Sequence, residues 1–161
     1  MQKSTKQQSG LTMTQKLNDF LQQHYNEKHA TDTGTGTHKL LQSVFFDDDE
    51  HYTGNTQIIN EIKQHPEICK YFNSSSMTEV PIAGYIKNEF ISRRIDRLLI
   101  DHNTKNIVFI DYKTNTDKLK FIDKYKKQLS EYSVLLKNAY PDYSVAGFIL
   151  WTNDWVLEKI I

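Results

Sequence analysis

The chain has 161 residues, the length of one domain, and its 38% hydrophobic and 25% charged residues form an ordinary globular composition. Lys and Arg together number 20, as do Asp and Glu, which excludes the global basic field of a tight independent nucleic-acid binder. No apolar run reaches the length of a membrane span, and the N-terminus lacks the apolar core of a signal peptide. We therefore expect a cytoplasmic protein with no membrane partner.

The single cysteine, Cys69, excludes an internal disulfide and is too few for a cysteine-held iron–sulfur cluster. Residues 1–10 are polar and predicted to be a disordered tail, and residues 11–161 are predicted to be a single domain. Residues 11–25 have apolar side chains at helical spacing, which predicts a helix.

A Gly-Thr-Gly loop within residues 31–37 precedes a helix predicted over residues 38–46. The loop lacks the spacing of a phosphate-binding loop, so we expect no bound nucleotide. The acidic run at residues 47–50 is interpreted as a solvated turn. Two short helices are predicted over residues 57–63 and 66–72, with Pro66 at a first helical position, and Glu79 opens a predicted strand beside residues 90–100.

Residues 94–114 are predicted to form two antiparallel strands joined by a polar turn. Because successive strand side chains face opposite sides, Asp96 should point away from Ile95, and Asp111 and Lys113 should share a face opposite to Tyr112. Two carboxylates and a backbone carbonyl near Tyr112 are enough to hold a hard cation such as Mg²⁺. Lys113 could orient a water molecule or offset the negative charge.

Other interpretations of these residues remain open. An Asp at a strand end is most often a turn former, and the lysine beyond it is usually a solvated charge. Asp96 could form a structural ion pair with Arg94 or Arg97. For His38, the local sequence by itself favours a solvent-facing histidine at a helix N-terminus.

A long helix is predicted over residues 118–140, with Tyr125, Gln128 and Tyr132 on one face. Residues 113–127 contain six lysines and two aspartates, a local excess of four positive charges that could contact backbone phosphates. A solvated helix face would have the same composition. Residues 145–151 are predicted to be a closing strand, and residues 155–161 a short final element.

Several motifs occur in the order expected of a known family. The segments Ile95-Asp-Arg-Leu98, Ile110-Asp-Tyr-Lys-Thr114 and residues 125–132 resemble successive motifs of the RecB-like branch of the PD-(D/E)xK nucleases. Residues 34–42 and 79–82 resemble the upstream histidine motif and the acidic strand of that branch. With Tyr140-Pro141 and residues 149–152 added, the sequence is most similar to the C-terminal nuclease domain of AddA-type helicase-nucleases of double-strand break repair, over residues 30–152.

The resemblance implies an α/β fold with a restriction-endonuclease-like core, in which helices flank a small mixed central sheet, with additional N-terminal helices. It implies a Mg²⁺-dependent DNA nuclease, with Mn²⁺ as an alternative metal, that hydrolyses phosphodiester bonds by a metal-activated water, here expected to be an exonuclease of double-strand break repair and recombination. The implied partners are DNA and a helicase or AddB-like subunit.

The expected site residues fall into three groups. The expected metal ligands are His38, Asp96, Asp111 and the Tyr112 backbone, with Glu79 as a further candidate. The expected catalytic residues are Asp96, Asp111, Lys113, Gln128 and Tyr132. The expected DNA-binding residues are Arg93, Arg94, Lys118, Lys120, Tyr125, Lys126 and Lys127.

Two features depart from the family pattern. Arg93 stands where the family usually has Gly, and a positive φ there would cost an arginine about 1 kcal/mol. In an ordinary β conformation, Arg93 would add a phosphate-facing charge. The chain also has no ATP-binding motif, so it is either a fragment of a longer helicase-nuclease or a module that stands alone. The alternative function is a catalytically silent DNA-binding or scaffolding module that docks on a helicase.

Overall fold

The computed structural model describes residues 36–47 and 52–161. A helical segment over residues 36–42 comes first. The remaining elements, in chain order, are β1 (Phe45–Phe46), β2 (Tyr52–Thr53), α2 (Thr56–Lys63), α3 (Pro66–Cys69), β3 (Met77–Ile86), β4 (Glu89–Asp101), β5 (Asn106–Lys113), α4 (Lys118–Ala139), β6 (Ser144–Trp151) and β7 (Val156–Lys159).

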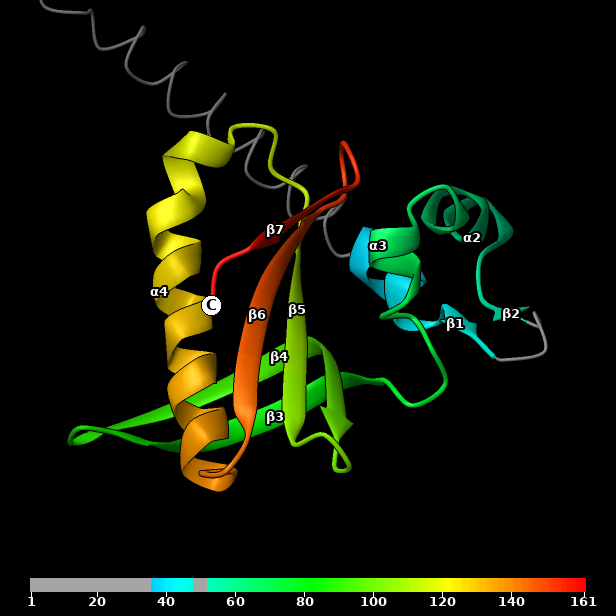
Figure 1. The fold of residues 1–161 in the computed structure, drawn as a ribbon. Coiled ribbons are helices and arrows are strands. Elements are labelled where there is room, and N and C mark those ends of the chain that lie inside the picture. The colour runs from blue at the N-terminus through cyan, green and yellow to red at the C-terminus, as the bar shows by residue number, and fades with distance from the viewer. Residues whose placement is uncertain (1–35, 48–51) are drawn as a thin grey trace, which may run out of the picture.

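The core is a five-stranded mixed sheet in the order β3-β4-β5-β6-β7 (Figure 1). β5 and β6 are parallel because α4 connects them as a crossover, and the other neighbouring strands are antiparallel. The expected α/β architecture, with a mixed central sheet flanked by helices, is confirmed. β1 and β2 form a separate two-stranded antiparallel sheet.

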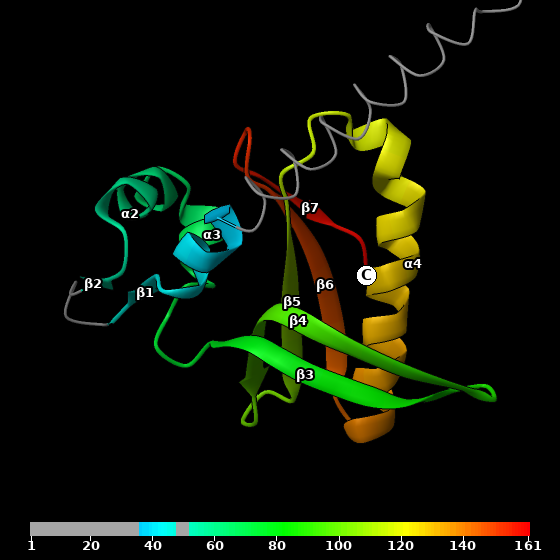
Figure 2. The same ribbon diagram turned by 180° about the vertical axis from the view of Figure 1, so that it is seen from behind.

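Helices cover the two faces of the sheet (Figures 1 and 2). Alternation along β5 accounts for this arrangement, because Ile107 and Phe109 join the apolar cluster under α4, whereas Ile110 and Tyr112 join a second cluster with residues of the N-terminal helices. The second cluster includes Ile62 of α2 and residues around α3. One strand thus contributes to two separate cores.

β4 changes its pairing partners near Asp96. It pairs with β3 along nearly its whole length but with β5 only from Arg97 to Asp101. The upstream half of β4 and its partner β3 therefore continue as a two-stranded hairpin. In both ribbon views this hairpin projects beyond α4 (Figures 1 and 2).

Three predicted elements have different bounds or types in the structure. The helix predicted over residues 38–46 ends at residue 42, and Phe45–Phe46 is the strand β1. Tertiary contacts explain this early end, because the Phe46 N–H donates to Phe72 O rather than to a helical carbonyl. The helix predicted over residues 66–72 has Pro66 at its start, as expected, but ends at Cys69. Strand β6 does not close the sheet, because β7 pairs with its outer edge.

The predictions for residues 1–10, 11–25 and 48–50 lie outside the described residues. Within residues 36–47 and 52–161, no helix is both long enough and apolar enough to cross a membrane.

Candidate functional site

Asp96 lies at the point where β4 leaves β5. Beyond this point the Tyr112 N–H has no β4 carbonyl opposite it, and it donates to Asp96 Oδ2 at 2.7 Å. The carboxylate thus replaces a backbone hydrogen bond of the sheet and is buried there, with 9% of the residue exposed. Neither Arg94 nor Arg97 forms a structural ion pair with Asp96, because Arg94 pairs with Glu79 and Arg97 donates to Tyr112 OH.

Asp111 and Lys113 lie on the same face of β5, as predicted, and Tyr112 lies on the opposite one. The Lys113 ammonium contacts Asp111 Oδ2 as an ion pair. Asp111 Oδ1 accepts from Gln128 Nε2 at 3.2 Å and from Tyr132 OH at 3.3 Å. Asp111 Oδ2 is buried, and its contact with the Lys113 ammonium lacks hydrogen-bond geometry. A cation that bound to this oxygen would have to compete with Lys113 for it.

α4 contributes the side chains that hold this pair in place. Gln128 accepts from Lys113 Nζ at 3.4 Å through Oε1, while its amide nitrogen donates to Asp111 and, at 2.5 Å, to Tyr132 OH. The single hydroxyl hydrogen of Tyr132 is shared between Asp111 Oδ1 and the backbone oxygen of Arg94, which lies 2.9 Å from Tyr132 OH. Gln128 and Tyr132 thus link β4, β5 and α4, as their shared helix face predicts.

Tyr125, the third residue of that face, lies further from the carboxylates. Its ring packs under Lys113, whose Nζ lies 4.4 Å from the ring centroid, and its hydroxyl donates to Asn115 Oδ1. Tyr125 is itself buried. In this arrangement it supports the position of the lysine and offers little exposed surface to a ligand.

His38 comes from the helical segment over residues 36–42 and lies against the same site. Its Nδ1 is 3.7 Å from Asp96 Oδ1, and its ring meets Tyr112 edge-on with centroids 5.5 Å apart. Its side chain is 28% exposed. The interpretation as a fully solvent-facing histidine therefore does not describe its position.

Arg97 anchors this helical segment to the sheet and was not predicted as a site residue. Its fully buried guanidinium donates to the backbone oxygens of Leu41 and Val44 at 2.9 and 3.0 Å. It also donates to Tyr112 OH at 2.7 Å and to Ser76 Oγ at 2.5 Å. Because Arg97 follows Asp96 directly, its bonds fix the segment that contains His38 next to the carboxylate.

Glu79 lies opposite Asp96 in the β3–β4 register, where the regular pairing is interrupted and Glu79 has a φ of 55°. Its Oε1 accepts from Gln42 Nε2 at 2.5 Å, and its Oε2 accepts from Arg94 Nη1 at 3.1 Å. Gln42 was also missed as a site residue, although its position four residues after His38 places both on one helix face.

The electrostatics of the site show that negative charge is poorly compensated. Burial, followed by the neighbouring Asp111 carboxylate, raises the pKa of Asp96 from 3.8 to about 8. Burial also lowers the pKa of His38, although the charge of Asp111 acts in the opposite direction. The site therefore disfavours a second ionised carboxylate, which a bound cation would stabilise, and it favours neutral His38, the form of the ring that can bind a metal.

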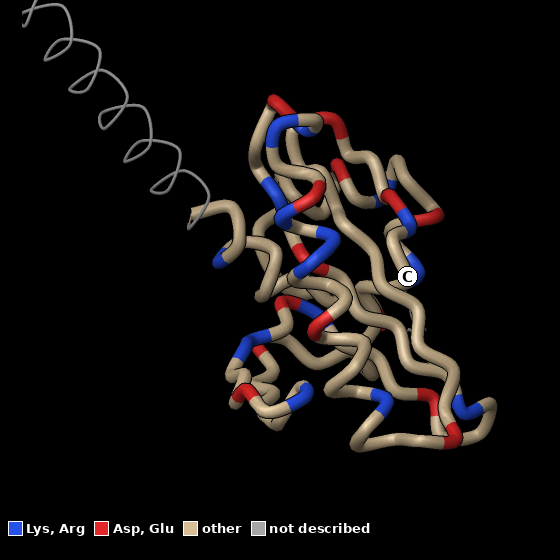
Figure 3. Tube along the Cα trace, turned by 90° about the vertical axis from the view of Figure 1, so that its left-hand side faces the viewer, with Lys and Arg blue, Asp and Glu red and all other residues tan. Residues whose placement is uncertain are grey.

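Some of the predicted DNA-binding residues form ion pairs with acidic side chains, and others are exposed. Arg93 does not have a positive φ, so it replaces the family glycine without strain, and its guanidinium pairs with Glu131 of α4 at 2.7 Å. Lys118 pairs with Asp154 at 2.5 Å. The exposed lysines of α4 are Lys120, Lys124, Lys126, Lys127 and Lys137. Seen from the side of α4, Lys and Arg positions are interspersed with Asp and Glu positions (Figure 3).

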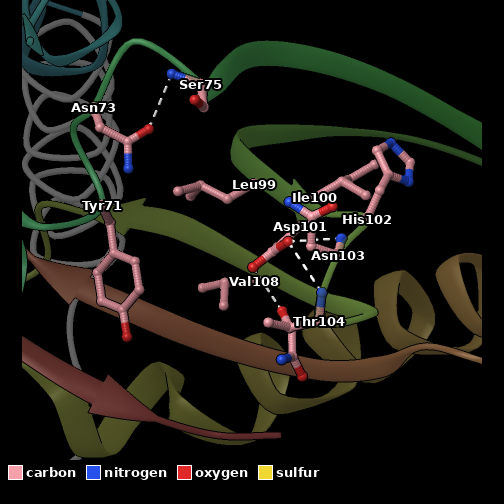
Figure 4. A pocket seen from close by; sticks show the side chains of 11 residues that line it. Tyr71, Asn73, Ser75, Leu99, Ile100, Asp101, His102, Asn103, Thr104 and Val108 are labelled. Atoms are coloured by element: carbon pink, nitrogen blue, oxygen red, sulfur yellow. Dashed lines mark hydrogen bonds between the residues drawn. The ribbon is translucent and has the colours of Figure 1, made fainter.

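A hollow with a volume of about 580 Å³ lies away from these residues, between the β4–β5 turn and the segment after α3 (Figure 4). Its main acid, Asp101, accepts from the Asn103 and Thr104 N–H groups and from the Thr104 hydroxyl, as a turn-forming aspartate does. None of the predicted site residues lines it.

In the part of the chain that the structure describes, no three His, Cys, Asp or Glu side chains are gathered closely enough to hold a metal ion as they stand. The predicted metal site stays a prediction. No protein-family model matches the chain, and no match was found among curated proteins.

Proposed function

We propose that the protein is a Mg²⁺-dependent DNA nuclease that hydrolyses phosphodiester bonds. One observation carries the proposal: His38, Asp96 and Asp111 come from three separate segments to one place, where both carboxylates are buried and Lys113 contacts Asp111 Oδ2. A fold seldom buries two neighbouring carboxylates beside a lysine unless a ligand or a reaction requires them.

The residues present fit a divalent cation. Two carboxylates and the Tyr112 backbone carbonyl would supply oxygen ligands, and His38 would add a nitrogen ligand that also suits Mn²⁺. Burial and the neighbouring Asp111 carboxylate raise the pKa of Asp96, and a cation bound between the two carboxylates would lower it. Bound there, the cation would lower the pKa of a coordinated water and offset charge on a phosphoryl oxygen.

The chain's own residues have separable roles in this proposal. Asp111 would hold the cation. Lys113, which contacts Asp111, would orient the attacking water or balance charge on the phosphate. Gln128 would keep both groups in place, because its amide bonds to each of them. Tyr132 would fix Gln128 and the β4 backbone.

The mixed sheet, with candidate carboxylates on β4 and β5, is compatible with a restriction-endonuclease-like core, and we include that core in the proposal. The RecB-like order of the motifs supports an exonuclease of double-strand break repair that works with a helicase or AddB-like subunit. The equal numbers of basic and acidic residues fit a nuclease that a partner delivers to DNA rather than one that binds DNA tightly by itself.

The test is cleavage of linear single- and double-stranded DNA by the purified chain in Mg²⁺, Mn²⁺ or Ca²⁺. We expect cleavage in Mg²⁺ or Mn²⁺ that is lost in Asp111→Asn and Lys113→Ala. Lys105→Ala is the matched control, because Lys105 lies in the β4–β5 turn, away from the site. Cleavage that persists in both site variants would contradict the proposal.

A second candidate is a catalytically silent DNA-binding or scaffolding module that docks on a helicase. It is favoured by the contact between Lys113 and Asp111, which occupies both groups, and by the lack of a ready-made three-ligand group among the described residues. DNA binding by the parent without cleavage in any of the three metals, with or without a helicase partner, would support this candidate.

A further inference from the structure

The β3–β4 hairpin has two different faces. On one face Ile91 is buried, Gly84 lies close to Leu135 of α4, and Arg93 pairs with Glu131. The side chains of this face therefore point towards α4. The side chains at the alternate positions of both strands point away from α4.

We call this other side the outer face of the hairpin. It is formed by the cross-strand pairs Tyr85 with Phe90, Ala83 with Ser92, and Pro81 with Arg94, all of which are exposed. The next position in the same register is Glu79 opposite Asp96. The outer face thus leads from the hairpin tip directly to the candidate active site.

The tip of the hairpin displays two aromatic rings. Tyr85 is 67% exposed and Phe90 is 59% exposed, although large apolar side chains usually find cover. They lie directly opposite each other, with ring centroids 5.4 Å apart and planes at 65°. A tight turn at Lys87, which has a φ of 57°, fixes the two strands beside them.

The spacing along the hairpin suits a nucleic-acid strand. Five residues lie between Phe90 and Asp96, so the two positions are roughly 20 Å apart along the β-strand. This length is enough to contact several nucleotides of a single strand. Between the two ends, Arg94 has a side chain that is 67% exposed, and only one of its nitrogens is engaged, by Glu79. It retains donors for a phosphate.

We propose that the outer face of the hairpin is a binding track for single-stranded DNA, in which Tyr85 and Phe90 stack on bases and Arg94 contacts the backbone on the way to the carboxylates. This inference rests on the proposed nuclease function. Stacking on aromatic side chains needs bases that are not already paired, so the track selects single strands or frayed ends over intact duplex.

A protein partner fits this surface less well. Beyond the two rings the outer face carries Ala83, Ser92, Pro81 and Arg94, so it has no continuous apolar patch of the kind that protein interfaces bury. A bound protein would also cover the approach to Asp96. A single strand that lay along this face would instead be led towards Asp96.

The experiment measures the affinity of the full chain for a fluorescent 12-nucleotide single strand and for a blunt duplex, by anisotropy in Ca²⁺, with the DNA checked for intactness. Tyr85→Ala combined with Phe90→Ala should weaken single-strand binding at least about ten-fold and change duplex binding less than about two-fold. Tyr85→Phe with Phe90→Tyr should retain binding, because both keep a ring face. Tyr52→Ala, which removes an aromatic residue that is 46% exposed on β2, is the matched control.

A second measurement needs no variant: 2-aminopurine in the single strand should be quenched on binding to the parent. Unchanged affinity in the double alanine variant, or an equal loss for duplex, would overturn the track, as would the absence of quenching. Parent cleavage assayed on the same samples separates the two proposals. If the parent cleaves and the double variant binds as the parent does, only the track fails. If the parent binds no DNA and does not cleave it, both fail.

Discussion

Replacing Asp96 with Asn should stabilise the metal-free protein, and the effect should depend on pH. Burial, and then the charge of Asp111, raises the pKa of Asp96 from 3.8 to about 8 in the folded protein. Between these two values the folded protein binds a proton that the unfolded chain has lost. The stability of the parent should therefore fall as the pH rises from about 4 to about 8, and level off above that range.

The shift sets the size of the effect. At about 1.4 kcal/mol per pKa unit, the upper limit above pH 8 is roughly 6 kcal/mol. Asn retains an acceptor for the Tyr112 N–H, but its own amide NH₂ group must be desolvated, which offsets part of the gain. We expect a net gain of about 2 kcal/mol at pH 9, or a thermal midpoint higher by about 4–8 °C, and little gain at pH 5.

The assay is thermal denaturation followed by circular dichroism in EDTA at pH 5, 7 and 9. Asp101→Asn is the control, because hydrogen bonds from Thr104 lower the pKa of exposed Asp101 and its replacement should not stabilise the protein. An Asp96→Asn variant that is no more stable than the parent at pH 9 would refute the reasoning. An equal gain at all three pH values would also refute it.

Three further variants test other parts of the structure. Arg97→Met should lower the free energy of unfolding in urea by about 3 kcal/mol, because it leaves two backbone carbonyls without donors, whereas exposed Arg94→Met should change it by less than about 0.5 kcal/mol; equal effects would contradict the anchoring role. Gly147→Ala places a Cβ 2.3 Å from a ring carbon of the core and should cost about 1–3 kcal/mol by the same measurement, unlike Gly36→Ala, whose Cβ meets nothing within 4 Å. Gln128→Ala should lower the cleavage rate about 10- to 100-fold with little change in DNA affinity, and an unchanged rate would exclude its positioning role.

Local patterns predicted the central strands well. The alternation that places Asp111 and Lys113 on one face of β5 depends only on the geometry of an extended chain, and the structure confirms it. The early end of the first helix was not predictable in this way. Leu40 to Phe46 has an apolar pattern that suits a continued helix, but a buried guanidinium 53 residues away takes the carbonyl of Val44.

In the candidate site too, local patterns predicted some residues, and tertiary contacts determine the others. The helical spacing of Gln128 and Tyr132 predicted that they would act together, and both bond to Asp111. The approach of His38 to Asp96 depends on the anchoring by Arg97, which no local pattern specifies. Only the resemblance to a nuclease family suggested that His38 would lie near Asp96. The exposed rings of Tyr85 and Phe90 were missed. Two strands with alternating apolar and polar residues and a two-residue turn between them do not reveal how far the hairpin projects from the sheet.

The most direct test of the central claim is to locate a metal ion. Crystals of the chain soaked in Mn²⁺ should give an anomalous peak within coordination distance of Asp96 and Asp111, with His38 close to it. The same peak should be absent from crystals of Asp111→Asn. A Mn²⁺-soaked parent crystal with no peak between these side chains, while the chain still binds DNA, would contradict a metal-dependent nuclease and support a silent module.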